Sequence, residues 1–290
     1  MLTAPFIDPR ADAIVTNERL ALEGGAVQLA YGTHGERGTP VLFLMGLGVA
    51  GHAWRNFIVG LGERHRCVWL DNRGAGATRA RPGLYTMGLL ARDAQSLLDH
   101  LGIASAHVIG VSMGGMIAQR FALDARARVR SLSLIVTTPG GVRGRLPQLR
   151  GLSALLRRQR DVPEAKALHR LLFPRDYLAE VDLDALDELM RRDFVPAPLK
   201  SRLSQAAAVM RHNTRARLAE LGDVPTLVVK APHDVLVDPD QSDVLARGIP
   251  GARLVEMPDV GHGLLRQQPR ELLAVLSEHI LRVDQGALRG

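Results

Sequence analysis

The stretch Val108-Ile109-Gly110-Val111-Ser112-Met113-Gly114-Gly115-Met116 changes character at its centre. β-Branched apolar residues predict a strand before the serine, and the residues after it predict a helix. The Gly-x-Ser-x-Gly pattern between them predicts a tight turn that presents Ser112, with glycines where side chains would collide with backbone. Free N–H groups at the new helix N-terminus can stabilise negative charge there. Because the pattern also occurs in ordinary glycine-rich loops, its meaning depends on the rest of the chain.

Apolar runs elsewhere in the chain alternate with segments of helical periodicity. Residues 12–31 predict a hairpin of two strands around Glu23-Gly24-Gly25. Further strands are expected at residues 41–45, 66–70, 129–136, 226–230 and 252–256. Helices are expected over residues 53–63, 89–101, 239–247 and 263–283. This alternation predicts an α/β fold with a mostly parallel, doubly wound sheet of about eight strands.

The segment 141–220 has no convincing strand pattern and interrupts this alternation. Prolines divide it into helices expected at residues 147–160, 163–173, 176–193 and 198–219. The segment falls between two predicted strands, so it is inserted over the sheet edge where strands end and ligands bind. We therefore expect a helical lid at 141–220, on a core formed by residues 1–140 and 221–290.

The charge of the chain is concentrated in the expected lid. The 290 residues carry a formal charge of +7, and residues 141–220 hold 16 of the 37 basic and 10 of the 30 acidic residues. A site that stacks nucleic-acid bases would need aromatic side chains among these charges. The segment has only Phe173, Tyr177 and Phe194. We therefore expect no nucleic-acid partner.

Single features of the sequence limit the disulfides, metal sites and membrane segments that the chain can have. Cys67 is the single cysteine, so an intrachain disulfide is excluded and no cysteine-based metal site is expected. Met1–Arg10 lacks the basic and apolar regions of a signal peptide. The longest apolar run, Val41–Ala50, is too short to span a bilayer. We expect a cytoplasmic protein without a stable membrane anchor and without a metal or organic cofactor.

Two polar residues that follow predicted strands could act with Ser112. Asp234 follows the strand at 226–230, and His262 follows the strand at 252–256. A serine hydroxyl needs a neutral imidazole to accept its proton, and the imidazole needs a carboxylate to fix its tautomer and stabilise its cation. The chain order Ser, Asp, His at successive strand ends predicts a catalytic triad of Ser112, Asp234 and His262.

Neighbouring residues are weaker candidates for these roles. His233 precedes the candidate acid and should point away from the site, and Asp259 is expected to order the turn before His262. Asp238 and Asp240 lie near a helix start, where capping explains them. Other histidines lie at predicted hairpins, helix ends or in the lid: His34, His65, His100, His107, His169, His212 and His279.

Acyl transfer also needs two backbone donors for the oxyanion. The N–H of Met113 follows the nucleophile, and the loop after the first buried strand offers the N–H of Leu47. Gly46 lets the backbone approach a substrate closely. Met45, Gly46 and Trp54 are candidates for the pocket wall, but Trp54 could equally pack the first helix.

These features resemble the α/β-hydrolase superfamily of serine hydrolases. The resemblance rests on the elbow at 110–115, on the loop Asp71-Asn72-Arg73-Gly74-Ala75-Gly76, and on the segment from Asp234 to His262. More narrowly, the chain is similar to 3-oxoadipate enol-lactonases, anthracycline methyl esterases and related bacterial esterases. Two positions depart from the family pattern. Met45 replaces a histidine of the first oxyanion loop, and Thr78 replaces the serine that usually ends the second loop motif.

The triad and the resemblance together predict hydrolysis of a carboxylic ester or lactone through an acyl-enzyme on Ser112. Leucines of the expected lid could cover a partly hydrophobic small-molecule substrate: Leu152, Leu155, Leu156, Leu168, Leu171, Leu172, Leu186 and Leu189. An acyltransferase, a thioesterase or a C–C bond hydrolase could use the same triad, and a non-catalytic binding protein could share the fold. If Asp71 and Arg73 form an ion pair, we expect it to pin a loop beside the elbow.

Overall fold

The computed structural model describes residues 4–81, 83–141, 163–195 and 197–287. Within these residues, a nine-stranded sheet has the order β1-β2-β4-β3-β6-β7-β8-β9, and β5 pairs with β2. Its strands are Glu18–Leu22 (β1), Val27–His34 (β2), Pro40–Leu44 (β3), Arg66–Leu70 (β4), Arg79–Ala80 (β5), Ala106–Val111 (β6), Val129–Ile135 (β7), Thr226–Lys230 (β8) and Arg253–Glu256 (β9). The pairs from β4 to β9 are parallel, and those of β2 are antiparallel. The expected mostly parallel sheet is confirmed.

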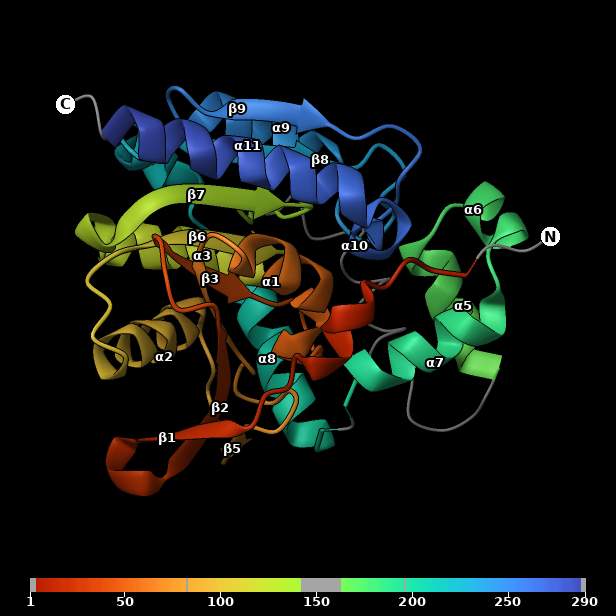
Figure 1. Ribbon diagram of the computed structural model, residues 1–290, viewed down its shortest axis with the longest axis horizontal. Helices are drawn as coiled ribbons and strands as arrows, with labels where there is room; N and C mark the ends of the chain where they lie inside the picture. Colours follow the sequence, from red (N-terminus) through yellow and green to blue (C-terminus); the bar gives the residue numbers. More distant parts are fainter. Residues whose placement is uncertain (1–3, 82, 142–162, 196, 288–290) are drawn as a thin grey trace.

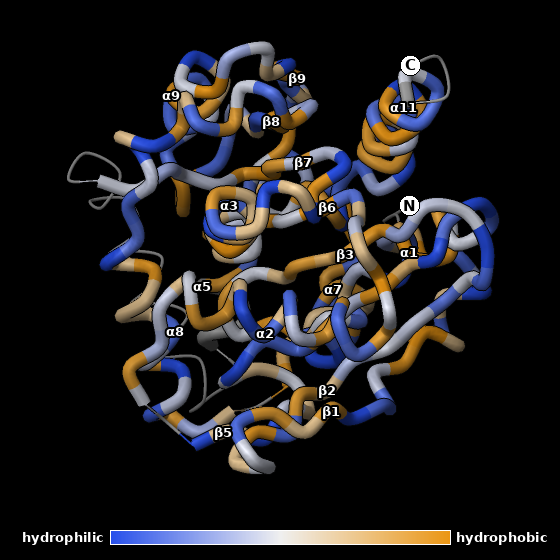
Figure 2. Tube along the Cα trace, turned by 90° about the vertical axis from the view of Figure 1, so that its left-hand side faces the viewer, coloured by the Kyte–Doolittle hydropathy of each residue, from blue (hydrophilic) through white to orange (hydrophobic). Residues whose placement is uncertain are grey.

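Helices cover both faces of this sheet (Figures 1 and 2). One face packs against α2 (Met87–His100), α3 (Met113–Asp124) and α9 (Asp240–Gly248). The other packs against α1 (Arg55–Gly62) and α11 (Pro269–Ala287). Short 3₁₀ turns occupy Pro9–Ala13, Glu23–Gly25, Gly51–Trp54, Arg126–Arg128 and Arg215–Leu221. This is the doubly wound arrangement that the alternation predicts.

The central strand β3 shows why the sheet needs cover on both sides. The side chains of residues 41–44 are all fully buried. Successive side chains of a strand point to opposite faces. Accordingly, Leu42 and Leu44 belong to the core beneath α2 and α3, whereas Val41 and Phe43 belong to the core beneath α1. An unbroken apolar run is therefore stable here only as an inner strand.

The segment between β7 and β8 is helical where the structure describes it. It contains α5 (Pro163–Leu172), α6 (Arg175–Glu180), α7 (Leu183–Asp193) and α8 (Leu199–Arg211). In Figure 1, β7 and β9 point towards the side of the molecule on which α5, α6 and α7 lie. These helices enclose a small apolar core of their own, which includes Phe173. The helix expected at 147–160, with Leu152, Leu155 and Leu156, lies outside the described residues.

Three helix boundaries differ from those expected. The helix predicted at 176–193 is two helices, because the side chain of Asp182 accepts the N–H of Ala185 (3.1 Å) and starts α7 anew. The last predicted helix is also divided, into α10 (Leu264–Gln267) and α11, which begins at Pro269. The helix predicted at 198–219 ends at Arg211 and is followed by a 3₁₀ turn.

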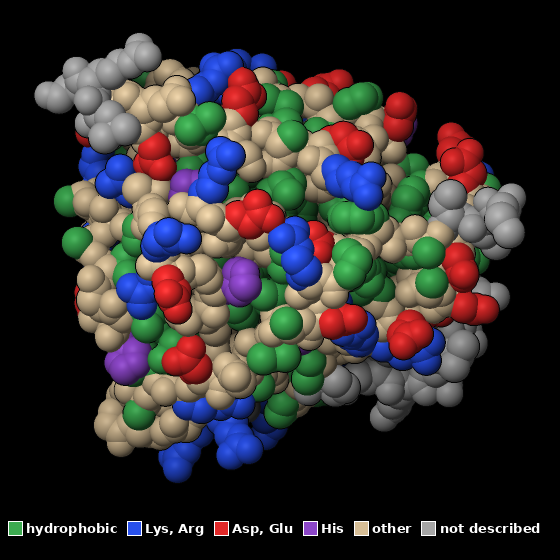
Figure 3. Space-filling view, in the orientation of Figure 1, with side chains coloured by type: hydrophobic (Ala, Val, Ile, Leu, Met, Phe, Trp, Pro, Cys, Tyr) green, Lys and Arg blue, Asp and Glu red, His purple; other side chains and the backbone are tan. Residues whose placement is uncertain are grey.

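The surface shows how the charges of the chain are distributed. On the face drawn in Figure 3, acidic and basic side chains are interspersed, and a group of basic side chains lies at its lower edge. Because acidic and basic side chains are neighbours on this face, their electrostatic fields partly cancel. Among the helices that the structure describes, none has the length and apolar character needed to cross a bilayer.

Candidate active site

Ser112 lies in a sharp turn between β6 and α3, with φ 55° and ψ −120°. This backbone conformation is strained for a residue other than glycine, and it lifts the serine out of the sheet. A Cβ on Gly110 would lie 2.3 Å from the carbonyl oxygen of Gly114, and a Cβ on Gly114 would lie 2.0 Å from that of Leu44. The two glycines are therefore required for the strand, turn and helix to meet at this angle.

Asp234 and His262 meet on the loops that follow β8 and β9. Nδ1 of His262 lies 2.7 Å from Oδ2 of Asp234. The other carboxylate oxygen of Asp234 accepts the N–H groups of Leu236 (2.8 Å) and Val237 (2.9 Å), so the buried side chain is held in one orientation. A carboxylate only accepts hydrogen bonds, which places the proton of the neutral imidazole on Nδ1 and leaves Nε2 as an acceptor.

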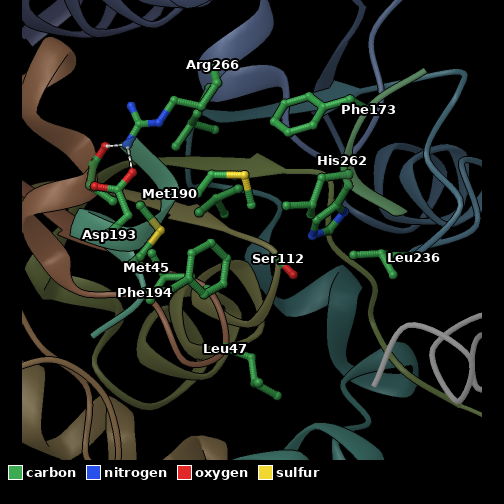
Figure 4. Close-up of a pocket in the computed structure, with 17 residues that line it drawn as sticks. Met45, Leu47, Ser112, Phe173, Met190, Asp193, Phe194, Leu236, His262 and Arg266 are labelled. Atoms are coloured by element: carbon green, nitrogen blue, oxygen red, sulfur yellow. Dashed lines mark hydrogen bonds and ion pairs between the residues drawn. The ribbon is translucent and has the colours of Figure 1, made fainter. Parts of the chain in front are cut away.

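The hydroxyl of Ser112 lies beside the imidazole of His262 in one pocket (Figure 4). Asp234 supports the imidazole through the contact described above, and only 6% of this residue is exposed. The three residues come from the ends of β6, β8 and β9, which are parallel strands of the same sheet. The structure thus brings together the three side chains that the sequence singles out.

The loop after β3 borders the serine. A Cβ on Gly46 would lie 3.5 Å from Cβ of Ser112, and Leu47 lines the same pocket. Met113 is the first residue of α3, so its N–H has no acceptor within that helix. Both segments that the sequence suggests as sources of oxyanion donors therefore adjoin Ser112.

The pocket at Ser112 has a volume of about 130 Å³ and largely apolar walls (Figure 4). Its lining residues are Met45, Gly46, Leu47, Val49, Ala53, Val111, Ser112, Leu172, Phe173, Met190, Asp193, Phe194, Leu236, His262, Gly263, Leu265 and Arg266. Met45 and Gly46 are thus placed where the sequence suggests. Trp54 is not: it is fully buried, with its ring centroid 5.3 Å from those of Phe43 and Phe57. It packs the first helix, which was the alternative explanation.

A buried charged cluster, absent from the expectations drawn from the sequence, contributes Asp193 and Arg266 to the pocket wall (Figure 4). Asp193, the last residue of α7, contacts the guanidinium groups of Arg55 and Arg266 through different carboxylate oxygens. All three residues are more than nine-tenths buried. Nη2 of Arg266 also donates to the carbonyl oxygen of Ala53 (2.8 Å). Burial lowers the pKa of Arg55, and the charge of Asp193 opposes that shift.

The partners in this cluster are far apart in the sequence, which explains why no local pattern reveals them. Asp193 is 138 positions from Arg55 and 73 positions from Arg266. One signal was available, because Arg266 follows two leucines at the start of a predicted amphipathic helix. A charge on the apolar side of a helix requires a buried partner.

The loop after β4 is pinned beside the elbow by contacts other than the expected ion pair. Asp71 accepts the N–H groups of Gly51 (2.6 Å) and Ala77 (2.7 Å). Burial raises the pKa of Asp71, and these hydrogen bonds oppose that shift. Among the described side chains, Arg73 pairs with Asp93 (2.6 Å) and with a glutamate of the β1–β2 turn.

The alternative candidates lie away from Ser112. His233 is exposed, and Nε2 of its ring is 3.9 Å from a carboxylate oxygen of Asp259. Asp259 adopts φ 61° in the turn before His262. Asp238 accepts the N–H of Asp240 (3.0 Å), the first residue of α9, while the N-cap residue of that helix is Pro239.

Cys67 and the other possible metal ligands give no sign of a metal centre in the part of the chain that the structure describes. Cys67 is buried in β4, and burial raises the pKa of its thiol. No group of three or more His, Cys, Asp or Glu side chains within the described ranges could hold a metal ion.

A parallel sheet that presents a serine on an elbow, beside a histidine from a later strand, defines a hydrolase of the α/β class. Residues 39–267 match the alpha/beta hydrolase fold family, which is most of the chain. The chain belongs to this family and is an α/β-hydrolase enzyme. The resemblance drawn from the sequence is thus confirmed at the level of the superfamily.

Individual relatives differ in the reactions that their names describe. The chain is 32% identical over 267 residues to a protein of Azorhizobium caulinodans named as a carbamate hydrolase. The matched region covers 90% of this chain and 98% of that protein. The chain is 33% identical over 250 residues to one of Mycobacterium tuberculosis named as a non-heme bromoperoxidase, covering 81% and 91%. An enol-lactonase structure from Burkholderia xenovorans is similar at 26% identity, with a TM-score of 0.80 and coverage of 91% and 99%. Hydrolase activity is supported, and the substrate is left open.

Proposed function

We propose that this enzyme is a serine hydrolase that cleaves a carboxylic ester or lactone with a small, apolar acyl group. One observation carries the proposal. The imidazole of His262 contacts the carboxylate of Asp234 through Nδ1, and the same ring lies beside Ser112 in an apolar pocket. This arrangement has each part of a proton-transfer relay from a serine hydroxyl. The sequence similarity to hydrolases and the structural similarity to an enol-lactonase agree with it.

Acylation would begin when Oγ of Ser112 attacks the carbonyl carbon and Nε2 of His262 takes the hydroxyl proton. The carboxylate of Asp234 stabilises the imidazolium that results. The N–H groups of Leu47 and Met113 would hold the oxyanion of the tetrahedral intermediate. When the intermediate collapses, the C–O bond of the ester breaks and His262 gives its proton to the leaving alcohol. The acyl group is then bonded to Oγ of Ser112.

Deacylation would repeat these steps with water as the nucleophile. Nε2 of His262 accepts a proton from water as the hydroxide attacks the acyl carbon, and then returns it to Oγ of Ser112. The products are a carboxylic acid and an alcohol. For a lactone, both groups belong to one hydroxy acid.

The size of the pocket limits the acyl group. Its volume of about 130 Å³ is close to that of a cavity of roughly 150 Å³ that accommodates a benzene ring. We therefore propose an acyl group of about four to six carbons. Leu172, Phe173, Met190 and Phe194 come from the segment between β7 and β8, so we propose that residues 141–220 form the lid of this pocket.

A series of p-nitrophenyl esters from acetate to decanoate, together with γ- and δ-lactones, tests the proposal. We expect the highest kcat/KM at butanoate or hexanoate, because longer chains exceed the pocket. Ser112→Ala should lower kcat by at least about 10³-fold and abolish labelling by a fluorophosphonate probe. Wild-type turnover by the alanine variant would contradict the mechanism.

The same acyl-enzyme could pass its acyl group to acceptors other than water. Trapping the acyl-Ser112 species and adding either water alone or water with a primary alcohol separates a hydrolase from an acyltransferase. A hydrolase gives mainly free acid in both cases. Matched thioesters and vinylogous diketones, assayed at equal concentration, test the thioesterase and C–C hydrolase alternatives directly.

A further inference from the structure

The turn that follows β3 is held by a side chain from α8. Gln205 is fully buried, and its Oε1 accepts the N–H of Gly48 at 2.9 Å. Its Nε2 donates to the carbonyl oxygen of Arg73 at 2.8 Å. We propose that Gln205 is a positioning residue, which fixes the orientation of the oxyanion loop from the inserted helical segment. This inference rests on the proposed function, in which the N–H of Leu47 stabilises the oxyanion.

The turn after β3 has the geometry of one of two common types of β-turn. The N–H of Val49 bonds to the carbonyl oxygen of Gly46 at 3.4 Å, which closes a β-turn. Gly48 has φ +70°, whereas Leu47 keeps a negative φ. This combination is that of a type II turn. Types I and II differ mainly in the orientation of the peptide group between the two central residues, which here joins Leu47 to Gly48.

The two hydrogen bonds of Gln205 select one of these orientations. Because Nε2 is committed to the carbonyl oxygen of Arg73, it is Oε1 that faces the turn. An oxygen there accepts the N–H of Gly48. A flip of the peptide would instead bring the carbonyl oxygen of Leu47 towards Oε1, so that two acceptors would face each other without a proton between them. Such an unsatisfied buried contact is unfavourable.

The orientation of this peptide matters because it restrains the peptide before it. The proposed donor, the N–H of Leu47, belongs to the peptide between Gly46 and Leu47, which is joined through Cα of Leu47 to the peptide that Gln205 holds, and this turn lies next to the nucleophile. A Cβ on Gly46 would lie 3.5 Å from Cβ of Ser112, and Leu47 lines the pocket. A backbone donor stabilises an oxyanion only if it points at the right place before charge develops. Since the oxyanion exists only around the transition state, loosening the turn should lower kcat and leave KM nearly unchanged.

The decisive variant is Gln205→Leu, which keeps the volume and removes both hydrogen bonds. We expect kcat for the best ester to fall about 10- to 100-fold, with KM changed less than about threefold. Affinity for a boronic acid that mimics the tetrahedral intermediate should fall by the same factor as kcat. Gln205→Glu retains an oxygen that can accept from Gly48 but places a second acceptor against the carbonyl oxygen of Arg73, so it should recover only part of the lost kcat.

Thr214→Val is the matched control. Thr214 is buried, and it donates to Oε1 of Gln119 on α3 at 2.6 Å, so this variant also removes a buried hydrogen bond between the chain after α8 and the core. We expect it to lower thermal stability to a similar degree and to leave kcat within about twofold of wild type. If Gln205→Leu and Thr214→Val reduce kcat equally, Gln205 is merely structural and the inference is wrong.

Amide hydrogen exchange tests the inference without any substrate. In wild type, the N–H of Gly48 should exchange much more slowly than an exposed amide, and Gln205→Leu should accelerate it while Thr214→Val does not. Rapid exchange at Gly48 in wild type would overturn the inference, even if Gln205→Leu fails to fold. A wild-type enzyme that hydrolyses no ester and no lactone, while the N–H of Gly48 is protected, would instead refute the proposed function and leave the role of Gln205 in the turn intact.

Discussion

Oδ2 of Asp234 lies 2.7 Å from Nδ1 of His262, while the other oxygen of the same carboxylate accepts two backbone N–H groups. The carboxylate therefore cannot rotate without losing several hydrogen bonds. Its position fixes both the tautomer and the plane of the imidazole. The loop after β8 thus controls how the histidine is presented to Ser112.

Asp234→Asn should therefore lower kcat for ester hydrolysis by about 10³- to 10⁴-fold, because an amide can donate to Nδ1 and stabilise the wrong tautomer. The folded state should persist, since the volume is unchanged. Asp259→Asn is the matched control, because this aspartate is 90% exposed in its side chain and lies three residues before the histidine. Similar losses of kcat in both variants would show that Asp234 has no special role in orienting His262.

Asp193→Asn should destabilise the fold. The variant leaves the buried guanidinium groups of Arg55 and Arg266 without their counter-ion, and breaking a buried pair in this way typically costs about 3–5 kcal/mol. We expect the free energy of unfolding, measured in urea, to fall by that amount. Arg192→Gln, which removes an exposed ion pair with Asp12, should leave it unchanged within error. Equal effects would show that the cluster contributes nothing beyond a surface contact.

Acid should destabilise the enzyme well before its carboxylates titrate. Burial lowers the pKa of His107, His212 and His279 from 6.5 to about 4. Below pH 6.5 these histidines are protonated in the unfolded chain but stay neutral in the folded chain. Their contribution to the free energy of unfolding is therefore fully present above pH 6.5 and is lost as the pH falls towards 4. Each histidine contributes about 1.4 kcal/mol per pH unit in this window.

Urea unfolding at pH 7 and pH 5.5 measures this effect, and we expect the free energy of unfolding to decrease by about 4 kcal/mol for the three histidines together. The variant His107→Gln tests the contribution of one histidine to this pH dependence. The amide can still bond to Ser131 and Asp284, whose oxygens lie 2.8 and 3.1 Å from the ring nitrogens, but it does not titrate. The slope of the free energy of unfolding against pH should then decrease by about a third. An unchanged slope would contradict the assignment to His107.

Two glycines beside Ser112 should respond differently to alanine. Gly114→Ala places a Cβ 2.0 Å from backbone oxygen, which cannot move, so we expect little folded protein. Gly46→Ala places its Cβ at ordinary contact distances of 3.5 and 3.9 Å from Cβ and Oγ of Ser112. This variant should fold with a similar melting temperature and lose several-fold in kcat/KM, since the methyl group occupies space next to the reacting carbon. Thermal melts and ester kinetics together check both outcomes.

The strands and the elbow could be predicted because their signals are local. An apolar run such as residues 41–44 can be stable only inside a covered sheet, and the glycines around Ser112 specify a turn within five residues. By contrast, Arg79–Ala80 forms a strand too short to show any periodicity. The break between α6 and α7 depends on one side chain, Asp182, which caps the second helix.

The contacts that complete the candidate site could not be read from the sequence. Gln205 and Gly48 are 157 positions apart, and Asp193 is 138 positions from Arg55. Each pairing depends on how the inserted helices sit on the core, which no periodicity encodes. Trp54 shows the opposite problem, because its position near the oxyanion loop suggests a pocket wall while its ring packs between Phe43 and Phe57.

Among the described residues, two hydrogen bonds join the helices between β7 and β8 to the loop after β3. Oε1 of Gln205 accepts the N–H of Gly48, and the carbonyl oxygen of Asp193 accepts the N–H of Ala50 at 2.9 Å. Engineers who exchange such segments between relatives to obtain new substrates would here also exchange the supports of the catalytic loop. A chimera of this enzyme that lacks glutamine at 205 and the aspartate at 193, whose side chain ties this end of α7 to Arg55 and Arg266, should acquire a new pocket and lose turnover at the same time. Restoring those two residues in the chimera is the direct way to separate substrate choice from rate.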